Sequence, residues 1–326
     1  MNQPVLSNDK PFLIIGRAGM DFYADPPGTR TEDATQFVSH LGGSSANIAV
    51  GLTKQGGSAA LVTRVSDDAI GRFCLNQLKS YGVDATHVHS EGGEARNSLA
   101  VVETRLQDTQ SVIYRNGAAD FEMTVEDVDA IDFSKYGALV TTGTVFASEP
   151  SRSATFHAFE KARSAGLPII FDVDYRPYSW PSAEVAADVY SRAGALCDIV
   201  VGNDEEFDFM AGKKGDGLAK AESLATSSAA IVVYKMGEKG AITFSGTNRV
   251  ETGIYTVQAL KPTGAGDAFM GTFLASLSQG RDLSDAVLRG SASAAIVVSK
   301  VACAPAMPTP DQLEKFLSIH PGPSVG

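Results

Sequence analysis

The segment from Lys261 to Phe269 carries the residue types best suited to chemistry in this chain. It reads Lys-Pro-Thr-Gly-Ala-Gly-Asp-Ala-Phe, and apolar side chains recur at helical spacing over 269–277, which predicts that a helix begins within the glycine run. Small residues let a phosphate come close to the backbone, and the free N–H groups of a helix N-terminus favour negative charge. Gly264, Ala265 and Gly266 therefore predict an anion-binding loop.

Asp267 lies in the first turn of that predicted helix. Its carboxylate would stand close to a bound phosphoryl group and could accept the proton of an attacking alcohol. In phosphoryl transfer the protein mainly positions and neutralises, with one carboxylate orienting the nucleophile and an anion hole taking charge from the transferred group. The alternative is structural: Asp267 stabilises the helix N-terminus and the glycines form a turn.

Composition limits the function classes. The chain has 326 residues, a formal net charge of −11 and 44% hydrophobic residues, typical of a globular protein with one large α/β domain or two small ones. An acidic chain disfavours nucleic acid, so an anionic ligand requires local cations or backbone amides. No apolar run suits a membrane helix, the start lacks the apolar stretch of a secretory signal, and the three cysteines look like reduced thiols. We expect a cytoplasmic protein with no nucleic-acid or membrane partner.

Apolar runs rich in strand formers alternate with stretches of helical spacing along the chain. This pattern predicts an α/β fold, with a central, mainly parallel sheet flanked by helices. The expected strands are 12–15, 60–65, 138–142, 168–173, 198–202, 230–234 and 241–244. The expected helices are 45–55, 69–81, 151–165, 182–195, 205–210, 218–226, 266–279, 283–299 and 310–319.

Two segments, 22–40 and 97–120, interrupt the alternation. Both contain strand formers and no clear helix, so we expect a small β-sheet inserted into the α/β body as a lid, within a single domain over residues 1–326. The alternative is two long surface loops, which are uncommon in compact domains.

Several familiar sites are absent from the sequence. It contains no G-x-x-x-x-G-K-[ST], G-x-G-x-x-G, H-E-x-x-H, C-x-x-C or G-x-S-x-G motif. The five histidines are scattered, which favours exposed or structural roles over metal ligation.

Five motifs, in order along nearly the whole chain, resemble those of the PfkB-type, ribokinase-like carbohydrate kinases. They are the second signature at 264–267, the first signature at 41–49 with Leu52, the strand-to-helix turn at 65–71, the N-x-x-E motif at 203–206 and the nucleotide-loop pattern at 235–240. The resemblance implies a ribokinase-like fold with a small β lid and an ATP-dependent kinase that uses Mg²⁺.

The resemblance also implies roles for individual residues. Asp267 would be the base, with Gly264, Ala265 and Gly266 as the anion hole. Sugar contacts would come from Asp21, Gly42, Gly43 and Asn47, and ATP contacts from Asn203, Lys235, Gly237, Gly240 and Thr263. Glu206 would hold magnesium through water, because Mg²⁺ keeps several of its waters. Without the resemblance, each motif has a structural alternative. Residues 42–47 also fit a turn with a helix cap, Glu206 fits a solvated carboxylate at a helix start, and Lys235 fits a side chain that faces solvent.

Finer features at 16–21, 114–116, 119–120, 172–180, 197–198 and 261–262 resemble the branch that phosphorylates the terminal hydroxyl of 5-dehydro-2-deoxygluconate in inositol catabolism. The carboxylate of such a sugar acid requires a cation beyond those serving ATP. Arg115 on the lid is the first candidate, Arg176 the second, and Arg17 a further one, since a guanidinium pairs with a carboxylate through two hydrogen bonds. The alternatives are a kinase for 2-keto-3-deoxygluconate or fructose, and a non-catalytic sugar or nucleotide sensor on the same fold.

Two further points concern ions and subunits. Many family members have an aspartate six residues before the catalytic one, which contributes to a monovalent-cation site, but this chain has Lys261 there. A monovalent cation is therefore doubtful, and the Lys261 ammonium either substitutes for it or is exposed.

Lids in the family often pair across a subunit interface, which makes a homodimer through the lid a plausible partner arrangement.

Overall fold

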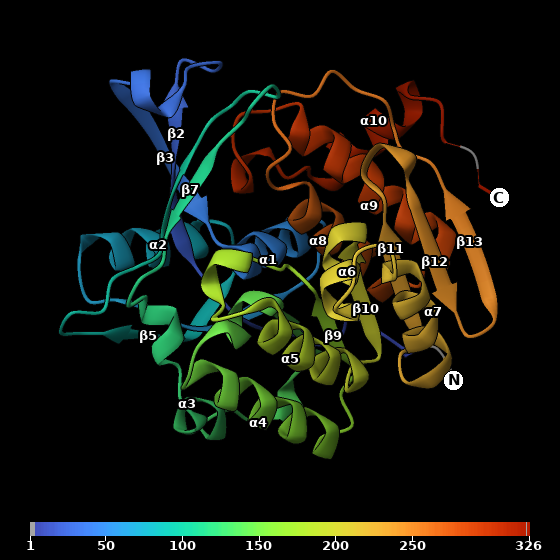
Figure 1. Cartoon of the computed structure of the whole chain (residues 1–326), viewed down its shortest axis with the longest axis horizontal. Coiled ribbons are helices and arrows are strands. Elements are labelled where there is room, and N and C mark those ends of the chain that lie inside the picture. Colours follow the sequence, from blue (N-terminus) through green and yellow to red (C-terminus); the bar gives the residue numbers. More distant parts are fainter. Residues whose placement is uncertain (1–3, 324) are drawn as a thin grey trace.

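The structure, a computed structural model, describes residues 4–323, 325 and 326. Its main sheet contains β1 (Phe12–Ile15), β4 (Ala59–Ser66), β5 (Asp84–Glu91), β8 (Ala138–Thr142), β9 (Ile169–Asp172), β10 (Ile199–Asn203), β11 (Ile231–Lys235), β12 (Ala241–Ser245) and β13 (Asn248–Thr252). These nine strands run in the order β13-β12-β11-β10-β9-β8-β1-β4-β5 (Figure 1). Neighbours from β11 to β5 pair in parallel, and β12 and β13 add an antiparallel edge. The predicted fold class is confirmed.

Helices cover both faces of this sheet. One face carries α1 (Ser44–Lys54), α2 (Ala69–Ser80), α8 (Ala265–Ser278) and α9 (Leu283–Val298), and α10 (Pro310–Ile319) packs on α9. The other face carries α3 (Val125–Asp129), α4 (Ser151–Ser164), α5 (Ala183–Ala195), α6 (Asp204–Ala211) and α7 (Gly217–Ser227). Two hydrophobic cores result, one on each face.

Strand β1 shows why the sheet needs both layers. All four of its side chains are apolar and buried, with Leu13 and Ile15 in one core and Phe12 and Ile14 in the other. Successive side chains of a strand point to opposite faces, so a continuous apolar run is stable only where both faces are covered.

A second, smaller sheet contains β2 (Gly19–Asp25), β3 (Gln36–Gly42), β6 (Leu99–Val102) and β7 (Ser111–Tyr114) in the order β3-β2-β6-β7. In Figure 1 its labelled strands β2, β3 and β7 lie at the upper left, to one side of the helices that cover the main sheet. The predicted small β lid is therefore present. Strands β2 and β3 together span Gly19 to Gly42, slightly more than the first predicted segment, 22–40. Strand β2 pairs with β6 in parallel.

Helices α1 and α8 meet in the middle of the molecule at two glycines. A Cβ on Gly271 would lie 2.9 Å from the Gly51 Cα and 2.9 Å from the Ile48 carbonyl oxygen, closer than real Cβ atoms approach. The two backbones can touch because Gly271 has no side chain, whereas a Cβ on Gly51 would lie 3.4 Å from the Gly271 Cα, in ordinary contact. Asn47 and Asp267 lie four residues before these glycines, on the same helix faces, so this crossing brings their side chains together.

The predicted strands and helices are all present, with ends shifted by at most one residue, and 12–15, 138–142 and 310–319 match in full. Among the α-helices and main-sheet strands of the described residues, β5, β13 and the short helix α3 were not predicted. Strands β5 and β13 are polar, largely exposed strands at the two edges of the sheet, so they lack the apolar signal that marked the central strands.

Within the described part of the chain, no helix is both long enough and apolar enough to cross a membrane.

Candidate active site

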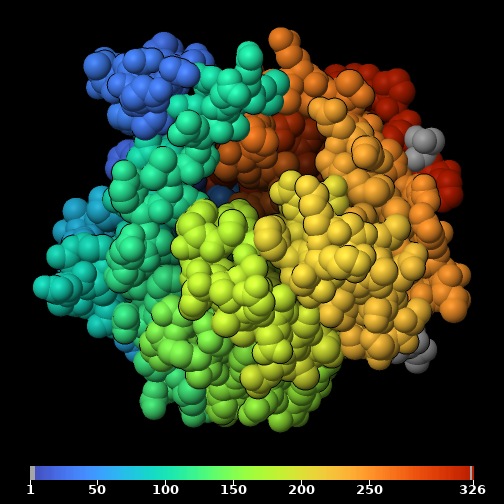
Figure 2. Space-filling model, in the orientation of Figure 1, coloured from blue at the N-terminus to red at the C-terminus, as the bar shows by residue number. Residues whose placement is uncertain are grey.

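Several site residues lie at the carboxyl ends of the parallel strands. Among the predicted ones, Arg17 follows β1, Asn203 ends β10 and Lys235 ends β11. Ligands of open α/β sheets bind at this end of the strands. Figure 2 shows a hollow on this side of the molecule, between the teal lid segment and the yellow-green and orange segments, with darker orange residues from the α8 and α9 part of the chain at its floor.

Asp267 and Asn47 form the central polar contact of this cleft. The Asn47 side-chain nitrogen donates a hydrogen bond of 2.9 Å to Asp267 Oδ2. The other atom of the amide, Asn47 Oδ1, is buried and has no hydrogen-bond partner among the described residues. A buried acceptor without a partner is costly in a folded protein, so Asn47 Oδ1 is available to a ligand hydroxyl.

Burial is the main cause that raises the pKa of Asp267 from 3.8 to about 6, and the negative charge of Asp174 adds to it. The hydrogen bond from Asn47 and the charges of Arg176 and Arg17 act in the opposite direction. A carboxylate with a pKa near 6 is ionised at neutral pH and is a better proton acceptor than an exposed aspartate.

Helix α8 presents a free N-terminus beside Asp267. Gly264 caps the helix with a φ of 87°, and no carbonyl or side chain among residues 4–323, 325 and 326 accepts a hydrogen bond from the N–H groups of Ala265, Gly266 or Asp267. A side chain at Gly264 would overlap Cys303 Sγ, so glycine is required there for its dihedral angle and for space. The predicted anion-binding loop therefore has the geometry expected of it.

Lys235 lies over this loop. A Cβ on Gly266 would be 3.5 Å from the Lys235 ammonium, and the same ammonium lies 5.6 Å from the centre of the Phe269 ring. The positive charge thus adds to the field of the helix N-terminus, and the solvent-facing alternative for Lys235 does not describe its position.

On the lid side, Asp21 packs against the first glycine pair. A Cβ on Gly42 would overlap the Asp21 carboxylate, and one on Gly43 would overlap the Arg17 carbonyl oxygen. Burial raises the pKa of Asp21 to about 6, opposed by the charge of Arg17, the Tyr23 hydroxyl and Lys261. The two glycines therefore give the backbone room to seat Asp21 at the cleft.

Asn203 and Glu206 form a reciprocal cap on α6. Asn203 Oδ1 accepts the Glu206 N–H at 2.8 Å, and Glu206 Oε2 accepts the Asn203 N–H at 2.7 Å. This capping box orients Glu206 and leaves its other carboxylate oxygen uncommitted. Burial raises the pKa of Glu206 and raises that of neighbouring Asp172 to about 8, while the charge of Lys235 lowers both.

The first two arginines expected to receive a substrate carboxylate, Arg115 and Arg176, already have acidic partners. Arg115 is buried, forms an ion pair with Asp120 and donates a 2.9 Å hydrogen bond to the Thr144 carbonyl. Arg176 pairs with Asp174 at 2.7 Å.

Asp172 and Asp174 are site residues that the sequence predictions did not assign. Asp174 adopts a φ of 36°, uncommon for a residue with a side chain, and its Oδ2 is buried without a described partner. The signal was available in the Asp-x-Asp spacing after an apolar strand, since it places both carboxylates where β9 reaches the cleft.

Lys261 is fully buried. Its ammonium donates to the Thr263 carbonyl and lies 3.9 Å from Cys303 Sγ. Burial lowers the pKa of Lys261, opposed by Cys303, Asp267 and Asp21. The exposed alternative for this side chain is wrong, and Thr263 contributes its carbonyl to the lysine.

The remaining loop glycines differ from each other. Gly237 has a φ of 56° and open space around it. Gly240 has a φ of 91°, and a side chain there would overlap the Thr252 carbonyl of β13. Packing against the sheet edge is thus sufficient reason for a glycine at 240.

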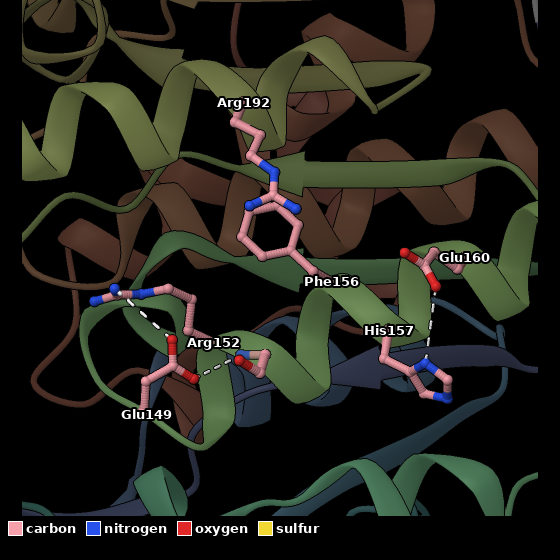
Figure 3. Close-up of a pocket in the computed structure, with 7 residues that line it drawn as sticks. Glu149, Arg152, Phe156, His157, Glu160 and Arg192 are labelled. Carbon is pink, nitrogen blue, oxygen red and sulfur yellow. Dashed lines mark hydrogen bonds and ion pairs between the residues drawn. The ribbon is translucent and has the colours of Figure 1, made fainter.

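Another hollow lies along α4 and is lined by Glu149, Arg152, Phe156, His157, Glu160 and Arg192 (Figure 3). Its charges have partners within it, since Arg152 and Glu149 are 3.8 Å apart and the Arg192 guanidinium lies 4.0 Å from the centre of the Phe156 ring. None of the predicted site residues lines it.

Comparison with solved structures defines the class of protein. A putative ribokinase II from E. coli, in complex with ATP and Mg²⁺, superposes with a TM-score of 0.85 over 95% of this chain and 100% of its own, at 19% identity. A fructokinase double mutant from Vibrio cholerae O395, with fructose, ADP and potassium ion bound, gives a TM-score of 0.83 at 26% identity over 97% of this chain and 100% of its own. The fold is that of the ribokinase-like sugar kinases.

The sequence then gives the family. The pattern of the pfkB family carbohydrate kinases matches residues 10–310, and the chain belongs to that family. A 5-dehydro-2-deoxygluconokinase from Photobacterium profundum is 37% identical over 98% of this chain and 99% of its own length. A second 5-dehydro-2-deoxygluconokinase, from Geobacillus kaustophilus, is 35% identical over 95% of this chain and 94% of its own length.

The contact between Asn47 and Asp267 can be tested by titration. Replacing Asn47 with leucine removes the donor that stabilises the ionised carboxylate, so the pKa of Asp267 should rise above its value of about 6. Carboxyl-carbon NMR against pH measures this, and Asp267→Asn identifies the signal by removing it. An unchanged midpoint in Asn47→Leu would show that the hydrogen bond does not influence the carboxylate.

Proposed function

We propose that this protein transfers the γ-phosphoryl group of ATP to the terminal hydroxyl of 5-dehydro-2-deoxy-D-gluconate, giving the 6-phosphate. The observation that carries the proposal is a partly buried carboxylate, Asp267, in the first turn of a helix whose N–H groups are free. The substrate is supported by the names of relatives that are 34–37% identical over nearly the whole chain.

Asp267 acts as the proton acceptor in this proposal. The substrate hydroxyl oxygen forms a bond to the γ-phosphorus, the bond from that phosphorus to the leaving oxygen breaks, and ADP departs with the electron pair. The hydroxyl proton passes to Asp267, while the N–H groups of Ala265 to Asp267 and the Lys235 ammonium stabilise negative charge on the phosphoryl oxygens. Asn47 holds the Asp267 carboxylate in place.

The sugar contacts in the proposal come from both sides of the cleft. Asp21, seated by Gly42 and Gly43, and Asn47 offer acceptors to substrate hydroxyls. Closure of the small sheet over the sugar would exclude water and so limit ATP hydrolysis.

The residues present fit a magnesium ion that travels with ATP. Among the described residues, no group of three or more His, Cys, Asp or Glu side chains is placed to hold a metal ion. Glu206 has one uncommitted oxygen in a buried acidic neighbourhood, which suits a magnesium-bound water. When bound, the ion neutralises phosphate charge, and Asn203, Gly237 and Gly240 shape the nucleotide end of the cleft.

A panel of sugar acids and neutral sugars tests this function by ADP release in a coupled assay. We expect turnover on 5-dehydro-2-deoxygluconate above 2-keto-3-deoxygluconate and fructose, and we expect Asp267→Asn to lose about 10²- to 10⁴-fold in kcat. Circular dichroism of the variant checks its fold. Preference for a different sugar would overturn the proposed substrate. A near-normal kcat in a folded Asp267→Asn variant would overturn the proposed role of Asp267. If no sugar causes ADP release, the protein is a sensor rather than a kinase.

Lys261 supplies a built-in cation in this proposal. Its ammonium is bonded to the carbonyl of Thr263, one residue before the Gly264 cap of α8, and it lies within electrostatic reach of Asp21 and Asp267. A positive charge fixed in this place holds the loop as a bound monovalent ion would, so the enzyme should require none.

Activity in different salts tests the role of Lys261. We expect the same kcat/KM in potassium chloride as in tetramethylammonium chloride. Lys261→Ala should lose activity and recover part of it with potassium or ammonium, because the shorter side chain leaves room for an ion. Lys315→Ala, on the exposed part of α10, is the control. Strong activation of the unmodified protein by potassium would contradict the proposal.

A second copy of the chain is the partner proposed for the outer face of the small sheet. The register places Phe22 beside Val101, Val101 beside Val112, and Leu99 beside Tyr114 on one face. Val112 and Tyr114 are 41% and 58% exposed. A contiguous apolar face of this kind is typical of a subunit interface.

Light scattering at several protein concentrations tests the dimer. We expect a dimer that Val112→Glu converts to a monomer, because the new charge would be buried against the partner. Ser111→Glu, next in the strand and on the opposite face, should stay dimeric. A monomer at all concentrations before any substitution would exclude this interface.

A further inference from the structure

Arg17 is held rigidly at the cleft. It lies two residues after the end of β1 and is only 6% exposed. Its carbonyl oxygen accepts a hydrogen bond of 3.2 Å from the Ala46 N–H. Gly43 packs so closely against this carbonyl that a Cβ on Gly43 would overlap the oxygen. The backbone from which the guanidinium extends is therefore fixed against the start of α1.

The guanidinium itself has few partners. Nη1 donates a 3.3 Å hydrogen bond to Ser98 Oγ, and Nε is buried without any partner. Across residues 4–323, 325 and 326, no carboxylate lies within ion-pair distance of Arg17, whereas Arg115 and Arg176 each have one. A buried charge without a counter-charge is strongly destabilising, so a residue in this state is expected to serve a ligand.

The charge of Arg17 reaches into the cleft. After burial, which raises the pKa of Asp21, the Arg17 charge is the largest influence that lowers it. The same charge also lowers the pKa of Asp174 and of Asp267, behind larger influences at each. The charge of Arg17 is thus felt at three carboxylates, yet among the described residues Arg17 forms an ion pair with none of them.

The position of Arg17 separates it from the phosphate end of the cleft. It follows β1 and contacts Ser98, which directly precedes the lid strand β6. Lys235 ends β11, and β8, β9 and β10 lie between these two strands in the sheet. An anion at Arg17 is thus a group on the sugar rather than a phosphate of ATP.

We infer that Arg17 binds the carboxylate of the sugar acid, and so determines the preference for an acid over a neutral sugar. The inference rests on the proposed function and replaces Arg115 and Arg176 in that role, because their guanidinium groups already have acidic partners. Nε together with one Nη can donate two parallel hydrogen bonds to a carboxylate.

Arg17→Gln tests the inference against a pair of substrates. One is 5-dehydro-2-deoxygluconate, and the other is the matching neutral sugar with a hydroxymethyl group in place of the carboxylate. We expect KM for the acid to rise by about 10- to 100-fold, the loss expected for hydrogen bonds to a charged group, with a smaller change in kcat. KM for the neutral sugar should stay the same or fall.

Arg115→Gln is the matched control, and thermal unfolding is the second readout. Arg115→Gln removes one partner of a buried ion pair, so the Tm of this variant should fall. Arg17→Gln removes an unpaired charge, so its Tm should stay the same or rise. Arg17→Lys keeps the charge, loses the paired geometry and should show an intermediate KM for the acid.

The outcomes separate the inference from the proposed function. If the unmodified protein phosphorylates no sugar acid, the proposed function fails. If it does so and Arg17→Gln keeps its KM for the acid, or loses equally on both sugars, the assignment to Arg17 is wrong. An acid-specific loss in Arg115→Gln with none in Arg17→Gln would assign the carboxylate to Arg115 instead.

Discussion

The contact between the backbones of α1 and α8 is the constraint on which the rest of the cleft depends. At Gly51 and Gly271 the helices approach until a single Cβ would force them apart. One turn further along, the same approach brings Asn47 to Asp267 and directs the free end of α8 at the carboxyl ends of the strands. The packing of two glycines thus sets the distance between the Asn47 amide and the Asp267 carboxylate, and a wider crossing would break the hydrogen bond between them.

The charge around the cleft differs from the net charge of the chain. The chain carries a net charge of −11, yet the cleft concentrates Arg17, Lys235 and Lys261 among its buried carboxylates. Each cation has a different environment: Lys261 is fixed on a carbonyl, Lys235 lies over a helix N-terminus, and Arg17 has a single hydroxyl partner. Separated cations of this kind fit the proposed binding of two anionic ligands, ATP and a sugar acid, by a chain of negative net charge.

Sequence reasoning reached the fold because the central strands are uninterrupted apolar runs and the helices keep a clear period, as in β1 and α10. It missed β5 and β13 because edge strands expose polar side chains and lose that signal. In the site, Asp267 and the loop of Gly264, Ala265 and Gly266 follow from local pattern, whereas Asn47 and the other glycines were assigned only through the resemblance to the kinase family. The partners of Arg115 and Arg176, the burial of Lys261 and the orphaned oxygen of Asp174 depend on residues that are distant in the sequence or on the tertiary environment, and no spacing rule predicts them.

Cys303 lies where three parts of the molecule meet. Its sulfur accepts the hydroxyl of Tyr23 from strand β2 at 3.4 Å, lies 3.9 Å from the Lys261 ammonium, and occupies the space a side chain on Gly264 would need. The small sheet and the cap of α8 thus both lie against one sulfur atom. A bulkier residue at 303 would have to push one of them away, so serine and alanine are the replacements whose size fits this position. The size of one thiol thus sets the spacing between the small sheet and the loop at the start of α8.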